Sequence, residues 1–210
     1  MFAVISPEKI ELPPGSLIQI PGTWEDYEAF SRQLGDRSIP RLKYRFGTIL
    51  FMSPLPQHGR DVHIISSVIT TILDYLNKEY EAFTPVTMKL SQRSGIEPDY
   101  CFYIDNWQAA AGKKRIDWEN EPAPDLVVEV DITSYTDIND YLPYKVPEVW
   151  LLKNNQITIY SLQNNQYIVS NRSRYFPDFE VLDLVQECFK VASDRNTSAA
   201  IRQLRQKLNN

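Results

Sequence analysis

Carboxylate side chains gather in two short segments, each with the pattern of a β-strand. The first runs from Glu97 to Ile104 and opens with two acids, Glu97 and Asp99. In the second, residues 124–131, the strand period of two divides the side chains between two faces. One face is apolar, with Leu126, Val128 and Val130, and the other carries Asp125, Val127, Glu129 and Asp131. Crowded anions repel one another and lose hydration. The two segments therefore predict one site in which a bound cation, a proton or water compensates the negative charge.

The elements around these segments predict an α/β fold, a mixed sheet flanked by helices. The firmest helix runs from Gln57 to about Tyr80, where apolar residues recur every three or four positions. A shorter helix starts after the N-cap Thr23, with Asp26 three residues later, and stops at Gly35. Strands are predicted at residues 42–52 (one, or two paired across 45–47), 83–90 and 98–104 (neighbours joined across 91–95), 126–132, 148–152, 157–162 and 167–170, with helices at 179–189 and from Asn196 or Thr197 onward.

The length of 210 residues suits one domain with a full core. We divide it into an extended N-terminal arm (1–20), an α/β domain (21–175) and a C-terminal helical tail (176–210). The tail carries an apolar stripe, Ile201, Leu204 and Leu208, that packs either on the domain or on a second subunit, so a homodimer is a possible assembly.

The composition is that of a soluble protein, with 43% apolar and 23% charged residues. No apolar run is long enough for a membrane span and no secretory signal opens the chain, so we expect a cytoplasmic protein with buried, reduced thiols at Cys101 and Cys188. A net charge of -5 argues against a simple electrostatic nucleic-acid binder, but not against a metal-dependent nucleic-acid enzyme. The basic residues at 41, 43 and 45 are interpreted as a solvated face.

Four motifs, taken in order, resemble the Uma-type endonuclease family of the restriction-endonuclease-like, PD-(D/E)XK nuclease superfamily. They are Met52-Ser-Pro-Leu-Pro-Gln-His58, Pro98-Asp99, Pro124-Asp-Leu-Val-Val-Glu-Val130 and Val146-Pro-Glu-Val-Trp150. The resemblance covers roughly residues 20–165. It implies a restriction-endonuclease-like core and a phosphodiesterase that uses Mg²⁺ or Mn²⁺, with Asp99 as the motif aspartate and Glu129 as the acid of the third motif.

Geometry independently favours Asp99 over Asp125 as the partner of Glu129. Four residues along a strand span roughly 13 Å, too far to share one Mg²⁺ whose bonds are about 2 Å, whereas an adjacent strand is about 5 Å away. Asp125 is then either a supporting residue of the site or a turn acid that caps backbone amides. Asp131, about 7 Å from Glu129 on the same face, is either a third metal ligand through water or an N-cap for the next turn.

The superfamily motif would place a lysine two residues after Glu129, where this chain has Asp131. Many Uma-type sequences carry the lysine further along, in a segment where residues 137–140 here contain two aspartates and no lysine. Such a lysine orients or deprotonates the attacking water and offsets charge on the phosphate. Lys145 and Lys89 are the candidates to replace it.

Histidines add a further candidate. His58 matches the family's histidine ahead of the helix, as a metal or phosphate ligand or as a capping residue. His63, five residues on, turns about 140° around a helix and does not form a metal pair with it. A glycine-rich phosphate loop and a nucleophile elbow are both absent from the sequence.

These features predict a divalent-metal-dependent nuclease that hydrolyses DNA, with RNA as the alternative substrate, by an activated water. Its catalytic candidates are Asp99, Glu129, Lys145, Asp125 and His58, and its metal ligands Asp99, Glu129 and Asp131. The alternative is a degenerate nuclease fold that binds nucleic acid or a protein partner without cleavage. A metal-dependent hydrolase of another phosphate ester is a third hypothesis.

Overall fold

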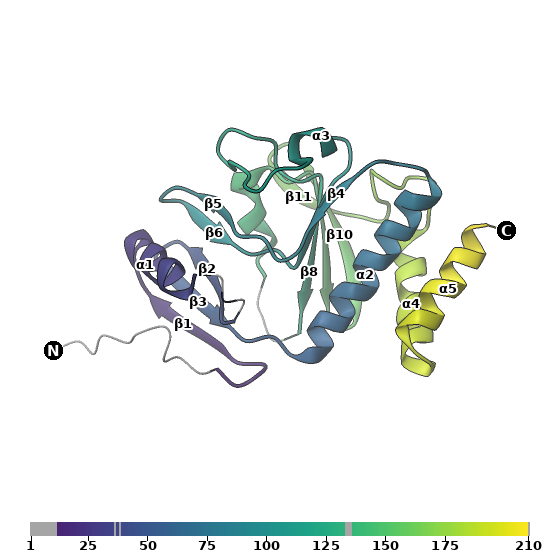
Figure 1. Ribbon diagram of the computed structural model, residues 1–210, viewed down its shortest axis with the longest axis horizontal. Coiled ribbons are helices and arrows are strands. Elements are labelled where there is room, and N and C mark those ends of the chain that lie inside the picture. Colours follow the sequence, from purple (N-terminus) through teal and green to yellow (C-terminus); the bar gives the residue numbers. More distant parts are fainter. Residues whose placement is uncertain (1–11, 36, 38, 133–135, 210) are drawn as a thin grey trace.

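The computed structural model describes residues 12–35, 37, 39–132 and 136–209, which form two β-sheets with helices packed on them (Figure 1). The strands are β1 (Leu17–Pro21), β2 (Arg41–Arg45), β3 (Thr48–Met52), β4 (Glu81–Phe83), β5 (Met88–Leu90), β6 (Ser94–Ile96), β7 (Tyr100–Tyr103), β8 (Leu126–Asp131), β9 (Glu148–Lys153), β10 (Gln156–Gln163) and β11 (Gln166–Ser170). The helices are α1 (Trp24–Leu34), α2 (Pro56–Tyr75), α3 (Trp107–Ala110), the 3-10 helix η2 (Ile138–Tyr144), α4 (Val181–Asp194) and α5 (Thr197–Leu208). The predicted α/β class is confirmed.

The six-stranded sheet has the order β11-β10-β9-β8-β7-β4, with β8 and β9 parallel and the other pairs antiparallel. Helices α2, α4 and α5 cover one face, and Leu126, Val128 and Val130 of β8 are buried among them. On the other face, Val127 packs with side chains from β5, β6 and η2. The alternation predicted for this strand is therefore confirmed, and Glu129 shares the face of Val127.

The five-stranded sheet, β1-β3-β2-β6-β5, lies at the opposite end of the molecule from α4 and α5 (Figure 1). Its β2 and β3 place alternate apolar side chains, among them Leu42, Tyr44 and Phe51, against α1. The other residues of β2, namely Arg41, Lys43 and Arg45, point to the opposite face, because strand neighbours alternate. We call these three side chains the basic stripe; each contacts an aspartate, so the prediction of a solvated face is wrong.

Residues 81–103 differ from the predicted single hairpin. The structure divides them into four short strands: β4 and β7 pair in the six-stranded sheet, while β5 and β6 pair in the five-stranded sheet. Residues 97–99 carry the chain from one sheet to the other. Pro98 has no N–H to donate and restricts the residue before it, so a ladder is readily interrupted here. Asp99 consequently lies where the two sheets meet.

Local signals placed several elements correctly. Thr23 and Asp26 form a reciprocal capping box at the start of α1. The region 42–52 is two strands, β2 and β3, paired across residues 46–47. Asn154 and Asn155 both have positive φ, 52° and 60°, in the hairpin between β9 and β10.

Two helices end elsewhere than predicted. Helix α2 ends at Tyr75 and not near Tyr80, and α4 extends to Asp194, beyond the predicted end at residue 189. Tyr80 instead packs on the core beside β4, which begins at Glu81. Periodicity alone does not show where a helix leaves its packing surface.

The C-terminal stripe packs on the chain itself. Asn196 caps α5 by accepting a hydrogen bond from the amide of Ala199 at 2.9 Å. Leu204 is buried, and Leu208 packs against the same core as α2 and α4. Of the two predicted packing partners, the structure shows the domain; a homodimer stays a prediction.

Several predictions fall partly outside the described residues. Of the predicted arm, residues 1–11 are not described, and the described remainder includes β1, which pairs with β3. Residues 133–135, directly after the predicted strand at 126–132, are not described either. Cys101 and Cys188 are free and buried, as predicted. Within the described ranges, none of the helices combines the length and apolarity that crossing a membrane requires.

Candidate active site

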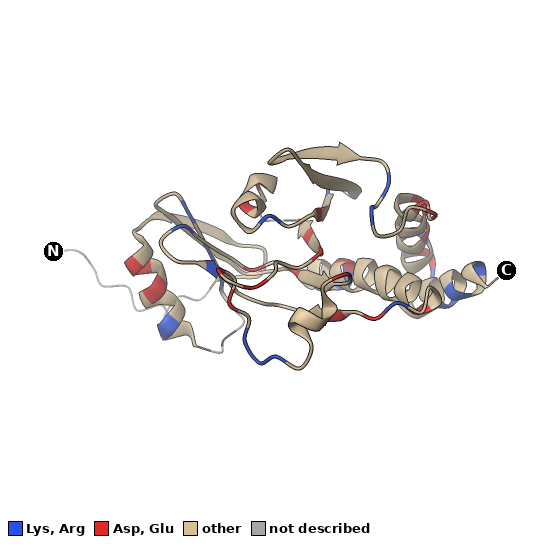
Figure 2. Ribbon diagram, turned by 90° about the horizontal axis from the view of Figure 1, so that it is seen from above, with Lys and Arg blue, Asp and Glu red and all other residues tan. Residues whose placement is uncertain are grey.

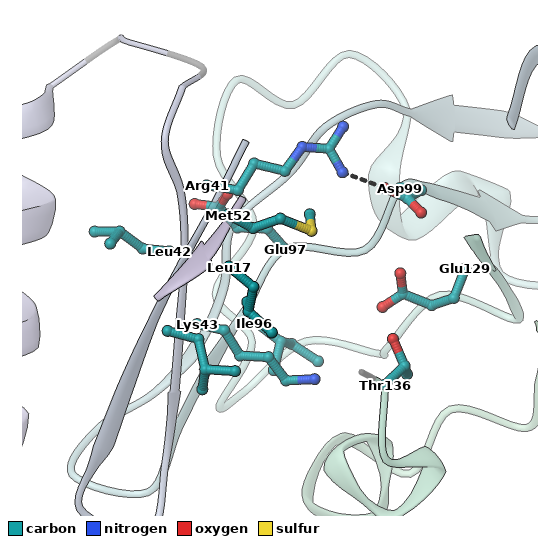
Figure 3. Close-up of a pocket in the computed structure, with 11 residues that line it drawn as sticks. Leu17, Arg41, Leu42, Lys43, Met52, Ile96, Glu97, Asp99, Glu129 and Thr136 are labelled. Carbon is teal, nitrogen blue, oxygen red and sulfur yellow. Dashed lines mark hydrogen bonds and ion pairs between the residues drawn. The ribbon is translucent and has the colours of Figure 1, made fainter. Parts of the chain in front are cut away.

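Asp99 and Glu129 face each other across neighbouring strands. In the antiparallel pair β7 and β8, Tyr100 is opposite Val128, so the next step of the register brings Asp99 opposite Glu129. The amide of Val130 donates a hydrogen bond to Oδ2 of Asp99 at 2.8 Å, which fixes that carboxylate against β8. Both acids line one cavity of about 50 Å³ (Figure 3). The structure thus brings together the two residues that the sequence paired.

The carboxylate of Asp99 is buried, with Arg41 and His58 beside it. The guanidinium of Arg41 contacts Oδ1, and Nε2 of His58 lies 3.0 Å from Oδ2. Burial alone would raise the pKa of Asp99, but His58 and Arg41 outweigh burial and hold this pKa below its ordinary value. Asp99 is therefore an anion at neutral pH. His58 thus contacts Asp99, and among the described residues no side chain caps the start of α2; the predicted role of His58 as a metal or phosphate ligand stays a prediction.

The pKa of Glu129 is shifted in the opposite direction from that of Asp99. The hydroxyl of Tyr141, on η2, donates a hydrogen bond to Oε1 of Glu129. Burial raises the pKa of Glu129 well above its ordinary value and the charge of Asp99 raises it further, while Lys43 acts in the opposite direction. Two neighbouring carboxylates whose pKa values are driven apart are typical of functional sites.

The basic stripe of β2 faces these acids from the five-stranded sheet. Figure 3 shows Arg41 reaching Asp99 and the amine of Lys43 directed toward the space beside Glu129 and Thr136. Lys43 forms an ion pair with Asp140 of η2, and Arg45 contacts the same aspartate through Nε at 2.8 Å. The cavity thus brings Asp99 and Glu129 together with Arg41 and Lys43 of the five-stranded sheet, and the rest of its lining is Glu97, Thr136 and apolar side chains.

A second cavity adjoins the first at Asp99 and Arg41. It has a volume of about 440 Å³ and runs along the N-terminal half of α2. Its lining is largely polar and includes His58, His63, Ser66, Ser67, Thr70 and Thr84. His63, which the sequence did not pair with His58, therefore lies at the same opening, although five residues separate the two histidines on the helix.

Asp125 and Asp131 bind backbone groups at the two ends of β8. Oδ2 of Asp125 accepts hydrogen bonds from the amides of Ile104 at 2.7 Å and Asn106 at 3.0 Å. The carboxylate of Asp131 accepts from the amide and the hydroxyl of Thr136 at 2.8 and 2.7 Å. These bonds agree with the capping interpretations of both acids. The metal role of Asp131 and the catalytic role of Asp125 stay predictions.

The two lysines proposed from the sequence line other parts of the surface. Lys145 ends η2 in the left-handed conformation, with φ 56°, and its exposed side chain lines a different cavity together with Trp118. Lys89 is bound by Glu28 and Ser31 at 3.0 and 2.9 Å beneath α1. The structure brings neither of them into the cavity of Asp99 and Glu129.

Sequence reasoning missed the residues that approach from the other sheet. Arg41 and Lys43 were noticed only as a basic cluster, and Asp140 and Tyr141 were not assigned a role. The i, i+2, i+4 spacing of the basic residues was the available signal, because it puts all three on one face of a strand. Which face turns toward the acids depends on how the two sheets meet.

The chain matches a family model across most of its length. The model is Uma2, described as "Putative restriction endonuclease", and it matches residues 24–188. The chain belongs to the Uma2 family. This confirms the family resemblance, and the matched region contains every residue of the cavity from Arg41 to Thr136.

Structural similarity agrees with the Uma2 assignment. One similar solved structure is a putative nuclease belonging to DUF820 from Anabaena variabilis ATCC 29413, with a TM-score of 0.51 and 17% sequence identity. The match covers 90% of this chain and 99% of that one, and it shows a shared nuclease-like fold. No curated protein matches the chain.

The donor set of the cavity fits a magnesium-type ion. Mg²⁺ is usually held by one or two carboxylates, with water and substrate phosphates completing its shell. Asp99 and Glu129 meet that requirement, and a cation between them would relieve the repulsion that helps raise the pKa of Glu129. Among the described residues, no group of three or more His, Cys, Asp or Glu side chains is placed to hold a metal ion, so the predicted set of Asp99, Glu129 and Asp131 is not gathered in one place.

Proposed function

We propose that this Uma2 protein is a divalent-metal-dependent nuclease that hydrolyses phosphodiester bonds of DNA. The observation that carries the proposal is the meeting of Asp99, directly before β7, with Glu129 of β8 in a cavity that Arg41 and Lys43 also line. Paired carboxylates suit a hard cation, and the basic wall suits the phosphate backbone.

Each residue has a defined task in this proposal. Asp99 and Glu129 would hold Mg²⁺ or Mn²⁺, which supplies polarisation of the phosphate and a more acidic water. His58 and the amide of Val130 orient Asp99 and keep it ionised, since both contact Oδ2. Arg41 offsets negative charge at the same carboxylate.

The polar cavity along α2 is the proposed path of the DNA backbone toward the acids. It adjoins Asp99 and Arg41, and its lining includes His63 and Ser67, whose side chains can form hydrogen bonds with phosphate oxygens. Elsewhere in the described chain, Figure 2 shows basic and acidic positions interspersed. Binding is therefore expected to depend on this local surface and not on a uniformly basic face.

Nicking of supercoiled plasmid in Mg²⁺ or Mn²⁺ tests the proposal. We expect Asp99→Asn and Glu129→Gln to abolish cleavage, and EDTA to abolish it in the wild-type protein. Glu148→Gln is the matched control: Glu148 is also buried, but it binds Trp150 and Ser173 away from the cavity. Metal-dependent folding or DNA retention without any cleavage would instead support a non-cleaving module.

A further inference from the structure

Lys43 is the basic residue that the cavity presents to Glu129. Of the described residues lining the cavity, it is the only lysine, and the only other basic one is Arg41, which is already bound to Asp99. Figure 3 shows Lys43 extending from β2 with its amine directed between Glu129 and Thr136. The side chain keeps 20% of its surface exposed and lines the cavity.

Asp140 holds this amine in place. Its own carboxylate is only 3% exposed and is fixed by Nε of Arg45 at 2.8 Å. Arg45 is fixed in turn by Asp137 at 2.6 Å. A buried aspartate bound on its other side restricts the rotamers of the lysine that it contacts, so the position of the amine is defined before any substrate arrives. The resulting ion-pair network joins β2, in the five-stranded sheet, to the helix η2.

In this network, β2 supplies the basic side chains at the cavity, where the superfamily motif would place a lysine on β8 and many Uma-type sequences carry one in the segment of η2. The positions in and before η2 carry aspartates, and the strand opposite carries the bases that pair with them. A long lysine side chain can deliver its amine to the same space from either wall. Neither Lys89 nor Lys145 competes for this role, because each lies outside the cavity.

We propose that Lys43 is the catalytic lysine of the hydrolysis, with Asp140 as its positioning residue. This rests on the proposed nuclease function. The oxygen of water forms the new bond to phosphorus while the bond from phosphorus to the departing sugar oxygen breaks. The attacking water loses one proton to solvent and the departing oxygen gains one. The ammonium of Lys43 donates hydrogen bonds to the phosphate oxygens, where negative charge increases in the transition state.

Chemical rescue tests the assignment in the full-length protein. We expect Lys43→Cys to lower single-turnover cleavage about 100-fold. Alkylation with bromoethylamine, which rebuilds a lysine-like amine on the cysteine, is expected to restore cleavage, whereas iodoacetamide adds a neutral group and does not. The native thiols are protected, since burial raises the pKa of Cys101 to about 12 and that of Cys188 to about 11.

Lys89→Cys, treated with the same reagents, is the matched control. Lys89 is likewise an ion-paired, partly exposed lysine, but it lies under α1, so we expect no change in cleavage from the variant or from either adduct. A second readout is the affinity for uncleaved duplex without divalent ions, which should fall less in Lys43→Cys than the cleavage rate does.

The outcomes separate the two proposals. A wild-type protein that never cleaves DNA overturns both. Wild-type cleavage that Asp99→Asn abolishes and Lys43→Cys leaves intact overturns only the assignment of Lys43. Equal recovery with both adducts, or no recovery with the amine, would show that Lys43 serves packing alone and would also overturn it.

Discussion

The centre and the ends of strand β8 use carboxylates in opposite ways. At the ends, Asp125 and Asp131 accept hydrogen bonds from the backbone of neighbouring loops. At the centre, Glu129 faces Asp99 and a cavity, with the charged wall of β2 opposite. The same residue types on one strand face therefore differ in role because of their partners: a carboxylate bound by amides stabilises the fold, whereas one opposed by another carboxylate stores repulsion that a ligand can relieve.

The largest expected effect on cleavage comes from substituting Glu129 at the centre of β8. Glu129→Gln should lower the cleavage rate on the order of 1,000-fold. It should not lower the free energy of unfolding, because it removes a carboxylate whose ionisation is disfavoured by burial and by Asp99. Single-turnover cleavage and urea denaturation measure the two quantities. If Glu129→Gln unfolds more readily but cleaves normally, Glu129 stabilises the fold as Asp125 and Asp131 do, and the proposed difference between the centre and the ends of β8 is wrong.

Asp125→Ala at the end should show the reverse pattern. It leaves the amide of buried Ile104, and that of exposed Asn106, without their acceptor, which should cost about 2 kcal/mol of unfolding free energy. The remaining folded protein should cleave at close to the wild-type rate. Urea denaturation with cleavage measured on the folded fraction checks this, and a catalytic Asp125 would appear as a rate lost without stability.

The pH dependence of cleavage and of stability should reflect the opposite pKa shifts of Asp99 and Glu129. Metal binding needs the ionised Glu129 carboxylate, so the cleavage rate should fall about tenfold for each pH unit below the pKa of Glu129. Because this pKa is raised, the fall should begin at a pH above the ordinary value of 4.5. The proton on Glu129 stabilises the fold at low pH, and this contribution should be lost as pH rises through the raised pKa. For Asp99, whose pKa is lowered, the contribution is present above 3.8 and lost as pH falls through the lowered value. Glu129→Gln should remove only the first component, as thermal unfolding across pH would show.

The smallest effect is expected at Lys145. Because its side chain is exposed and lines a different cavity, Lys145→Ala should change the free energy of unfolding by about 0.5 kcal/mol or less. Cleavage should be unchanged under the conditions that reveal the loss in Lys43→Cys. A large loss of cleavage in Lys145→Ala would return this residue to the role that sequence reasoning gave it.

Local patterns in the sequence account for much of the fold. The capping box of α1, the amphipathic pattern of α2 and the paired asparagines between β9 and β10 depend on nearby residues, and each appears in the structure. The predicted hairpin over residues 83–104 is only partly right: Phe83 pairs with Cys101, but residues 88–90 pair with β6, because the apolar pattern of a short strand does not specify its partner. Its four strands divide between two sheets.

The amino-acid sequence by itself determined that Glu129 shares a strand face with Asp131, because alternation is local geometry, and it predicted Asp99 as the partner of Glu129. The pairing of β7 with β8 then brought Asp99 and Glu129 together. Only the tertiary structure decided which bases oppose them. Arg41 and Lys43 are far from Glu129 along the chain and come from another sheet, so their approach depends on how the two sheets meet at residues 97–99. Contacts between distant elements are set by packing of the whole core, which no local pattern encodes.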